Sequence, residues 1–231
     1  MFATAHARPD GVSSVARFAL TARESGFDGL VVRNHDDEQS TFDRAAIAAE
    51  YDMDVVHAVE IRSDDRSSVA SAITKYRPQR TIVCVHGGQF NRLACEDPRV
   101  DVLCHPMADG EFNHVLASAA STNGVAVEFN FGRVLRATGG ERVHAISGLQ
   151  KLRTLVEKYD VPFVVSADPS SHLELRSSRE LKAVGETVGF SRSQIQAGLE
   201  RWAKIAARNR ARQSESFIEP GVYTDSYEEV D

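Results

Sequence analysis

Seven short apolar segments rich in β-branched residues, separated by segments with helical periodicity, constrain this chain more than any other feature. The apolar segments span 2–6, 28–33, 54–61, 81–86, 100–105, 125–131 and 162–167. Strands that alternate with helices form right-handed βαβ units and a parallel sheet. Segments that are apolar almost throughout are typical of strands buried on both faces. The pattern therefore predicts an α/β fold, either a barrel or a doubly wound sheet.

The spacers carry the 3.6-residue periodicity of amphipathic helices. In 12–25, for example, Val15, Phe18, Ala19 and Ala22 fall on one face. The other predicted helices span 42–51, 67–76, 89–96, 112–123 and 142–159, followed after the last strand by 177–188 and 191–212.

The regular pattern ends near residue 212. Residues 1–212 are predicted to form a single α/β domain with extra C-terminal helices. Residues 213–231 contain six acidic and no basic side chains and show little periodicity, so we expect a disordered acidic tail. No apolar run approaches the roughly 18 residues of a membrane span, and the first residues do not resemble a secretory signal. We therefore expect a cytoplasmic protein without a membrane partner.

The net charge of −6 hides an uneven distribution. Residues 1–132 carry 12 basic and 19 acidic side chains, whereas 133–212 carry 15 and 8. A basic third within an acidic chain suggests a polyanionic partner, although solvated helix faces also produce such a bias. Arginine outnumbers lysine 22 to 5, and its guanidinium suits bidentate contact with phosphate. The candidate RNA-binding residues are Arg133, Arg136, Arg142, Arg176, Arg179, Arg208 and Arg212.

Arg133, Arg136 and Arg142 lie in a glycine-containing segment directly after the sixth predicted strand, which we expect to be an exposed, flexible loop. Arg176 and Arg179 follow the seventh strand, so both groups are expected near the same rim. Aromatic residues do not interleave with these arginines, which favours contact with folded RNA over stacking on a single strand. Ordinary surface ion pairs are the alternative interpretation.

Polar residues occur at or near the end of every predicted strand. They are His6, Asn34 and His35, Glu60, His86, His105, Glu128 and Asn130, and Asp168. In a parallel barrel the carboxyl ends of the strands meet at one mouth, so these side chains should converge there. Imidazole and carboxylate groups together suit a transition-metal site or a general acid and base pair. Each histidine could instead cap a strand or bond to a loop carbonyl.

The segments TAHARPDG, VVRNH, VVHAVEIRS, VLCHPM, VEFNF and VVSADPSSHLELRSSREL resemble the p30-type protein subunits of ribonuclease P, the family of archaeal component 3. The resemblance runs over roughly residues 1–212. It implies a seven-stranded, TIM-barrel-like fold related to the polymerase and histidinol phosphatase (PHP) phosphoesterases. It also implies a ribonucleoprotein that removes the 5′ leader from precursor tRNA, in which the RNA subunit catalyses the reaction and Mg²⁺ is required by the particle.

The PHP phosphoesterases hold two or three metal ions with a set of histidine and acidic ligands, which this sequence keeps only in part. Arg8 stands in place of the second histidine and Ser170 in place of the last, with His172 two residues beyond it. Because an arginine repels a dication, we expect no metal or weak binding. The remaining matches to the ligand pattern are His6, His35, Glu60, His105 and Asp168. We prefer to interpret them as a hydrogen-bonded remnant, ahead of a weak metal site and an active hydrolase.

The sequence thus predicts a protein subunit of ribonuclease P that contacts RNA and is not itself catalytic. Its predicted partners are the ribonuclease P RNA, precursor tRNA, component 2 and the other protein subunits. The alternative is a metal-dependent phosphoesterase of the PHP type that works alone.

Overall fold

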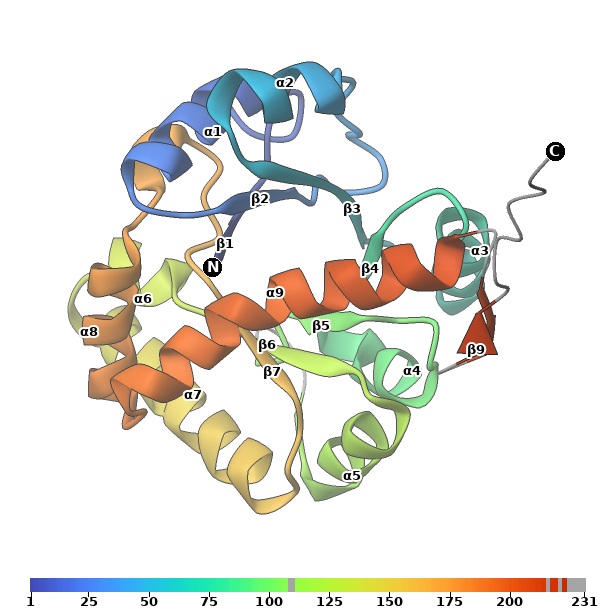
Figure 1. Cartoon of the computed structure of the whole chain (residues 1–231). Helices are drawn as coiled ribbons and strands as arrows, with labels where there is room; N and C mark the ends of the chain where they lie inside the picture. The colour runs from blue at the N-terminus through green and yellow to red at the C-terminus, as the bar shows by residue number, and fades with distance from the viewer. Residues whose placement is uncertain (108–110, 215–216, 220–221, 224–231) are drawn as a thin grey trace, which may run out of the picture.

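Seven parallel strands pair in sequence order and curve into a barrel in the computed structural model, which describes residues 1–107, 111–214, 217–219 and 222–223 (Figure 1). Each strand pairs with the next one along the chain, as the βαβ pattern predicts. The strands are β1 Phe2–Ala5, β2 Gly29–Val32, β3 Asp54–Ile61, β4 Ile82–His86, β5 Val102–Cys104, β6 Ala126–Asn130 and β7 Phe163–Ser166.

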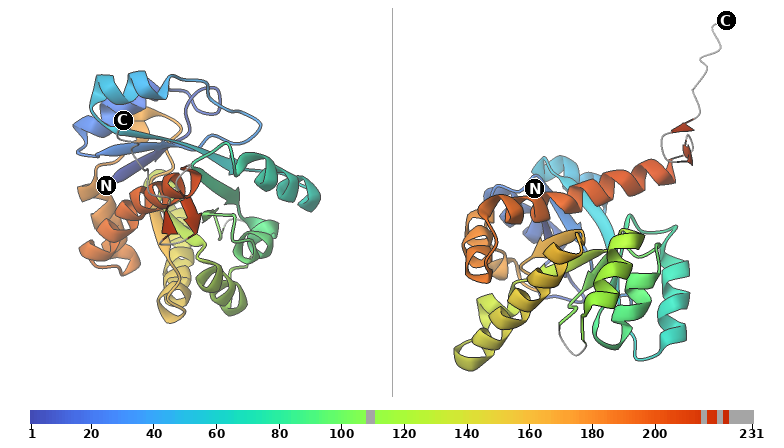
Figure 2. Two further views of the ribbon diagram at one scale, coloured as in Figure 1. Left: turned by 45° about the vertical axis from the view of Figure 1, so that its right-hand side comes forward. Right: turned by 90° about the horizontal axis from the view of Figure 1, so that it is seen from below.

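Helices surround the sheet, and at least one lies between each pair of consecutive strands (Figure 2). The helices between strands are α1 Val15–Glu24, α2 Arg44–Tyr51, α3 Arg66–Tyr76, α4 Asn91–Glu96, α5 His114–Asn123, α6 Gly132–Arg136 and α7 Gly139–Lys158. Short 3₁₀ turns, η1 Gly88–Phe90 and η2 His172–Glu174, precede α4 and α8. After β7 come α8 Ser178–Val188 and α9 Arg192–Gln213. Both begin with capping boxes, at Ser177 and Ser191, which satisfy the first free N–H groups of each helix.

The strand residues alternate between two apolar clusters. One face packs against the surrounding helices, and the other fills the barrel with residues such as Phe2, Val31 and Ala126. Because the side-chain period of a strand is two, the residue two positions beyond an inward apolar residue also points inward. Arg33 follows Val31 in this way, and Glu128 follows Ala126. The same alternation that builds the apolar interior therefore delivers charged groups to the mouth.

Helix α9 closes the opposite end of the barrel. Trp202, Ile205 and Ala206 join the inner apolar cluster, and the indole Nε1 of Trp202 donates to the carbonyl of Val165 in β7 at 3.0 Å. Strand β7 is one edge of the sheet and β1 is the other. The helix thus satisfies a carbonyl on an edge strand, where a neighbouring strand would otherwise pair. Figure 1 shows α9 lying across this end.

The structure differs from the sequence prediction in two segments. Residues 132–140, expected to be a flexible loop, contain α6 and the start of α7. Within the predicted disordered tail 213–231, Gln213 ends α9, and β8 Phe217–Glu219 pairs with β9 Val222–Tyr223. The other tail residues beyond 214 lie outside the described part of the chain. Among the described helices none is long and apolar enough to span a bilayer.

Candidate functional site at the mouth of the barrel

The strand ends bring the five predicted remnant residues into one cluster. His6 Nε2 lies 3.1 Å from Asp168 Oδ1 and 3.7 Å from Glu60 Oε2. His105 Nε2 lies 3.5 Å from Glu60 Oε1 and 3.6 Å from Asp168 Oδ2. His35 Nε2 lies 3.7 Å from Glu60 Oε1. The convergence predicted from the strand ends is confirmed.

Two further residues complete the cluster and were missing from the predicted set. The carboxylate of Asp10 bridges His6 Nδ1 at 2.7 Å and His35 Nδ1 at 3.0 Å. His86, noted only as a strand end, bonds Glu60 Oε1 through Nδ1 at 2.7 Å and stacks on His105. The signal for Asp10 was weak because it lies in the loop after β1, four residues beyond His6, rather than on a strand.

The loop after β1 is held so that Asp10 faces the histidines. The Asn34 side chain accepts from the Ala7 N–H at 2.9 Å and donates to the Ala7 carbonyl, which fastens this loop to the end of β2. A Cβ at Gly11 would overlap the carbonyls of His6 and Ser170, so only glycine fits at this close approach.

The guanidinium of Arg33 occupies the centre of the cluster. Its Nη1 lies 2.7 Å from Glu60, and its Nη2 lies 2.8 Å from Glu128 and 2.6 Å from Asp168. The Arg33 side chain is fully buried and lies over the ring of Trp202. Sequence reasoning missed this role, although an arginine at the end of an apolar strand was a usable signal.

The sequence predicted that Arg8 would lie at the cluster and repel a metal ion, and that prediction is wrong. Arg8 is exposed, and its Nε donates to the Val12 carbonyl at 2.7 Å. His172 also lies apart from the cluster, with Nδ1 2.9 Å from the Ser13 hydroxyl, and Ser170 bonds Glu174. The cation within the cluster is therefore supplied by β2 and not by the loop after β1.

Charge compensation shifts the pKa values of the clustered groups. Burial lowers the pKa of His6, but hydrogen bonds with Asp10 and Asp168 outweigh burial and raise it to about 9. Burial raises the pKa values of Glu60 and Asp168, yet Arg33, with the neighbouring histidines, holds both well below their usual range. The mouth is therefore a network in which several carboxylates share one guanidinium and one imidazolium.

The predicted RNA-binding arginines fall at two ends of the molecule. Arg133 and Arg136 lie on α6, Arg142 on α7, and Arg176 and Arg179 at the start of α8. These five follow β6 and β7, at the mouth.

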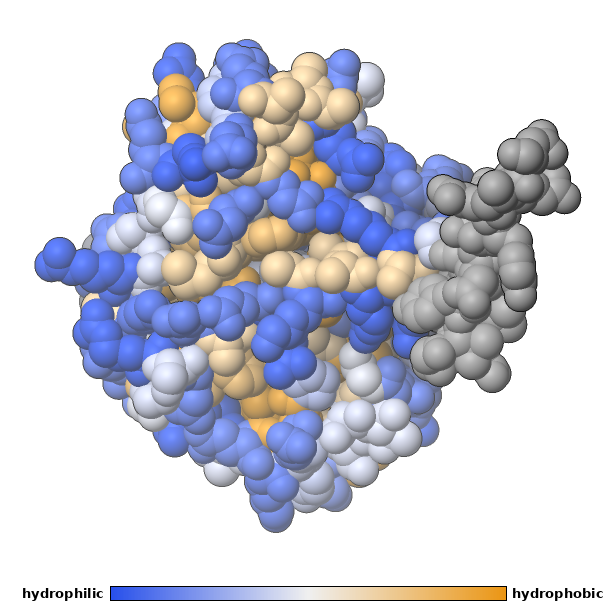
Figure 3. Space-filling model, in the orientation of Figure 1, coloured by the Kyte–Doolittle hydropathy of each residue, from blue (hydrophilic) through white to orange (hydrophobic). Residues whose placement is uncertain are grey.

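Arg208 and Arg212 lie on α9, at the closed end. Arg208 bonds Asp101 at 2.7 Å, directly before β5, and Asn209 bonds Thr81 directly before β4. The seven arginines therefore do not form one patch. Figure 3 looks onto the end covered by α9, where hydrophilic side chains cover much of the surface.

The five arginines at the mouth differ in their partners. Arg136 bonds the carbonyls of Ala167 and Asp168 at 3.0 Å, and Arg176 bonds those of Leu173 and Leu175. These two hold the loop after β7. The others, Arg133, Arg142 and Arg179, are exposed and form no ion pair within the described residues.

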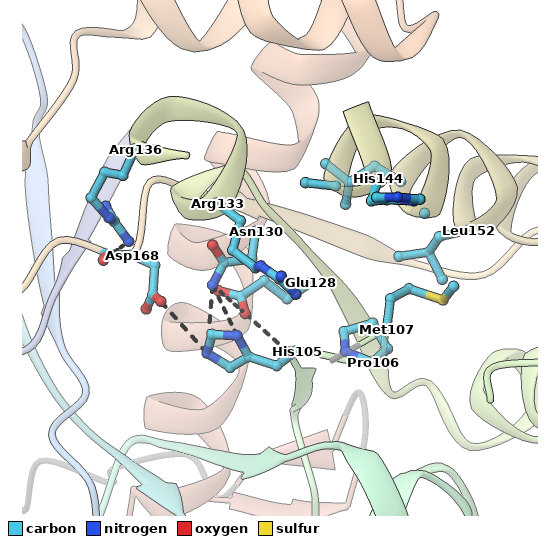
Figure 4. Close-up of a pocket in the computed structure, with 13 residues that line it drawn as sticks. His105, Pro106, Met107, Glu128, Asn130, Arg133, Arg136, His144, Leu152 and Asp168 are labelled. Carbon is cyan, nitrogen blue, oxygen red and sulfur yellow. Dashed lines mark hydrogen bonds and ion pairs between the residues drawn. The ribbon is translucent and has the colours of Figure 1, made fainter. Parts of the chain in front are cut away.

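A pocket of about 240 Å³ opens beside the charged cluster, between α6, α7 and the ends of β5 and β6 (Figure 4). One wall is apolar and is formed by Pro106, Met107, Ala145, Gly148, Leu149 and Leu152. The other side is polar and is formed by His105, Glu128, Asn130, Arg133, Arg136, His144 and Asp168. Mixed linings of this kind are typical of ligand pockets.

The sequence profile of the family described as RNase P subunit p30 matches residues 1–214. The chain belongs to the RNase P subunit p30 family. Ribonuclease P protein component 3 of Natronomonas pharaonis is 61% identical over 96% of this chain and 94% of its own length. Component 3 of Haloarcula marismortui is 56% identical over 96% of each chain. The p30-type resemblance of the sequence is confirmed, and the chain is a protein component of ribonuclease P.

Solved structures show where this p30 chain stands among barrel folds. A chain from a cryo-EM structure of archaeal ribonuclease P with mature tRNA matches with a TM-score of 0.83 and 24% identity over 100% of both chains. Histidinol phosphate phosphatase from Lactococcus lactis, complexed with zinc, L-histidinol and phosphate, matches with a TM-score of 0.57 and 12% identity, covering 82% of this chain and 94% of its own. The TIM-barrel-like, PHP-like fold predicted from the resemblance is confirmed.

The mouth of this p30 chain fits a dication poorly. His6, Asp10 and His35, and likewise His35, Glu60 and His86, place ligand atoms within 4.8 Å of one another. A dication bonded to Glu60 would, however, share this carboxylate with the Arg33 guanidinium, whose Nη1 lies 2.7 Å from Oε2, and the two cations would repel each other. His6, with a pKa of about 9, would also have to lose its proton before it could bind a metal.

Proposed function

We propose that this chain is a non-catalytic, RNA-contacting subunit of ribonuclease P that supports removal of the 5′ leader from precursor tRNA, with catalysis by the RNA subunit. The observation that carries the proposal is a group of exposed arginines beside the mouth that form no ion pair with any described residue, Arg133, Arg142 and Arg179. A guanidinium that is not held by a carboxylate can form charge-assisted hydrogen bonds with phosphate oxygens.

The positions of these arginines favour a folded RNA. Arg133 lies on α6, Arg142 near the start of α7 and Arg179 in the first turn of α8. Helical placement fixes their spacing better than the flexible loop expected from the sequence. A fixed array of cations matches the regular phosphate backbone of A-form RNA, which proteins recognise largely by shape. Arg136 and Arg176 act by holding the loop after β7, and Arg208 and Arg212 lie outside this surface.

In this proposal the chain holds no metal ion, and Mg²⁺ is required by the ribonucleoprotein as a whole. The position of Arg33 supports that part, because its guanidinium already lies beside Glu60, Glu128 and Asp168 and would repel a second cation there. The partners are the ribonuclease P RNA, precursor tRNA, component 2 and the other protein subunits, in the cytoplasm. The similarity to a chain of archaeal ribonuclease P with mature tRNA supports this assignment.

Paired variants test the RNA contact in a reconstituted particle. Arg142→Ala with Arg179→Ala should weaken RNA binding and reduce the slope of log K against log salt by about 1 to 2, as expected for two lost phosphate contacts. Lys204→Ala with Arg212→Ala removes the same charge from the closed end and should leave the slope unchanged. Equal effects of the two pairs, or none, would contradict the proposal.

The purified chain tests the competing phosphoesterase. Elemental analysis should find less than stoichiometric transition metal, and the isolated chain should not hydrolyse phosphate esters. Stoichiometric metal together with hydrolysis that His105→Ala abolishes would replace our proposal with a hydrolytic enzyme.

A further inference from the structure

We infer that the pocket between α7 and the ends of β5 and β6 receives one unpaired nucleotide of the bound RNA, with its base inside and its phosphate at the rim. The inference rests on the proposed function and adds to it a specific contact. The base would carry an exocyclic amine, as adenine, cytosine and guanine do. The shape, polarity and backbone of the pocket each support this assignment.

The size and apolar wall of the pocket suit a flat ring system. Its volume of about 240 Å³ lies below the range of about 300–1,000 Å³ that is typical of pockets for larger ligands. Met107, Leu149 and Leu152 line one side together with Gly148, which has no side chain to fill the space beside α7. A Cβ built on Gly148 meets no atom within 4 Å. A base can therefore lie against α7 without displacing a side chain.

The inner end of the pocket offers hydrogen-bond acceptors. Asp168 lines the pocket with 17% of its side chain exposed, and within the described residues its Oδ2 is contacted only by His105 Nε2, at 3.6 Å. That oxygen therefore has capacity to accept a further N–H. Because carboxylates accept from amines and repel phosphates, this end selects a base with an amine and excludes the phosphate group.

The outer end of the pocket carries an arginine and a histidine. Arg133 and His144 are exposed and form no hydrogen bond or ion pair with any residue that the structure describes. Figure 4 shows both beside the pocket, Arg133 on α6 and His144 on α7. A phosphate at the rim would lie near the Arg133 guanidinium while its base entered the pocket. The charge distribution thus fixes one orientation of the nucleotide.

Two residues at the inner end of the pocket have positive backbone φ values. His105 and Asp168, which both line the pocket, have φ values of 48° and 51°. Side chains other than glycine rarely adopt this left-handed region, and such residues cluster at ligand sites. In this conformation the two residues bring an imidazole and a carboxylate to the pocket from the ends of β5 and β7, on either side of β6.

Two glycines of α7 allow a matched test. Gly148→Leu fills the pocket, whereas Gly140→Leu places the same side chain near the start of the same helix, where a Cβ also meets no atom within 4 Å. Both replacements raise helix propensity, so both variants should fold. Circular dichroism melts of the two chains check this directly.

The measurement uses the reconstituted particle irradiated at 254 nm, with mass spectrometry of the crosslinked peptides. We expect adenosine, cytidine or guanosine attached to peptides containing Met107 or residues 144–152. Gly148→Leu should abolish this crosslink and weaken RNA binding about tenfold, the loss expected for one stacked base. Gly140→Leu should retain the crosslink and bind within twofold of the unmodified chain. Uridine as the crosslinked nucleotide, or equal behaviour of the two variants, would overturn the inference.

Further comparisons separate this inference from the proposed function and from a site for free nucleotides. If Arg142→Ala with Arg179→Ala weakens RNA binding but Gly148→Leu does not, the pocket assignment fails and the proposed function stands. AMP, CMP, GMP and UMP titrated into the isolated chain should bind no tighter than millimolar. Micromolar binding of a free mononucleotide would assign the pocket to a small molecule and overturn its assignment to RNA.

Discussion

Replacement of the buried cation, Arg33→Ala, should destabilise the chain more than any change to a surface arginine. Three ion pairs of 2.6–2.8 Å join the Arg33 guanidinium to Glu60, Glu128 and Asp168, and the Arg33 side chain is fully buried. Removing one partner from a buried ion pair leaves an uncompensated charge and costs about 3–5 kcal/mol. We expect a loss of at least that size, because three carboxylates lose the same partner.

The variant should also reverse the pH dependence of stability. In the unmodified chain Arg33 holds the pKa values of Glu60 and Asp168 below their unfolded values. The stability that these two ionised carboxylates contribute is therefore lost only as the pH falls below about 4. Without the guanidinium, burial raises both folded-state pKa values above the unfolded ones. The folded variant then binds more protons than the unfolded chain. Its free energy of unfolding should therefore increase as the pH falls from about 8 to about 5.

The same variant should acquire an affinity for divalent cations, because it leaves a cavity lined by carboxylates beside His6 and His105. Added Mn²⁺ at tenfold its dissociation constant would restore about 1.4 kcal/mol. The unmodified chain, which already holds a cation there, should gain less.

Urea unfolding followed by circular dichroism, at several pH values and with or without Mn²⁺, provides the assay. Arg210→Ala is the matched control, because Arg210 pairs with Asp54 at 2.7 Å while both side chains are more than a third exposed, so its loss should be at most about 1 kcal/mol. If Arg33→Ala does not fold, Arg33→Lys keeps the charge and should be stable and insensitive to Mn²⁺. A loss below about 1 kcal/mol with an unchanged pH dependence would refute the role of Arg33 as the central cation.

Three further predictions concern pH and packing. The pKa of His6 in the folded chain, about 9, exceeds the usual 6.5. About 3 kcal/mol of stability that is present below pH 6.5 should therefore be lost as the pH rises through 9. In urea titrations, the free energy of unfolding of His6→Gln should depend less on pH over this range than that of the unmodified chain. Trp202→Phe should lower the free energy of unfolding by about 1–3 kcal/mol, because the carbonyl of Val165 loses its donor; an unchanged value in chemical denaturation would argue against the closing role of α9. Gly185→Ala should cost about 1–3 kcal/mol in thermal melts, because the added methyl overlaps Ile195 between α8 and α9, and a stabilised variant would contradict that packing.

The sequence determined the strands and helices because their signals are local. Alternation and helical periodicity involve residues a few positions apart, so the seven strands and the order of the helices, apart from the short α6, could be predicted from neighbours along the chain. The capping boxes at Ser177 and Ser191 are equally local. The convergence of His6, Glu60 and His105 also followed, because parallel strands in one barrel end at one mouth.

Partners far apart in sequence required the tertiary structure. Arg33 and Asp168 are separated by 135 positions, and only closure of the sheet brings the guanidinium between the carboxylates. The sequence pattern indicated which residues reach the mouth but not which of them is the cation at its centre. For the same reason the sequence assigned the repulsive role to Arg8, which points away into a loop.

The arginines show the same division between local and tertiary information. Composition and order along the chain identified a basic third, but they could not distinguish the mouth from the end closed by α9. The return of α9 across the barrel places Arg208 beside Asp101, which is 107 positions away. Helix α9 is held across this end because Trp202 is buried inside the barrel. The burial of so large a side chain depends on every helix and strand packed around it. Local sequence patterns therefore determined the helices and strands. Long-range packing determined which charged side chains are available to bind another molecule.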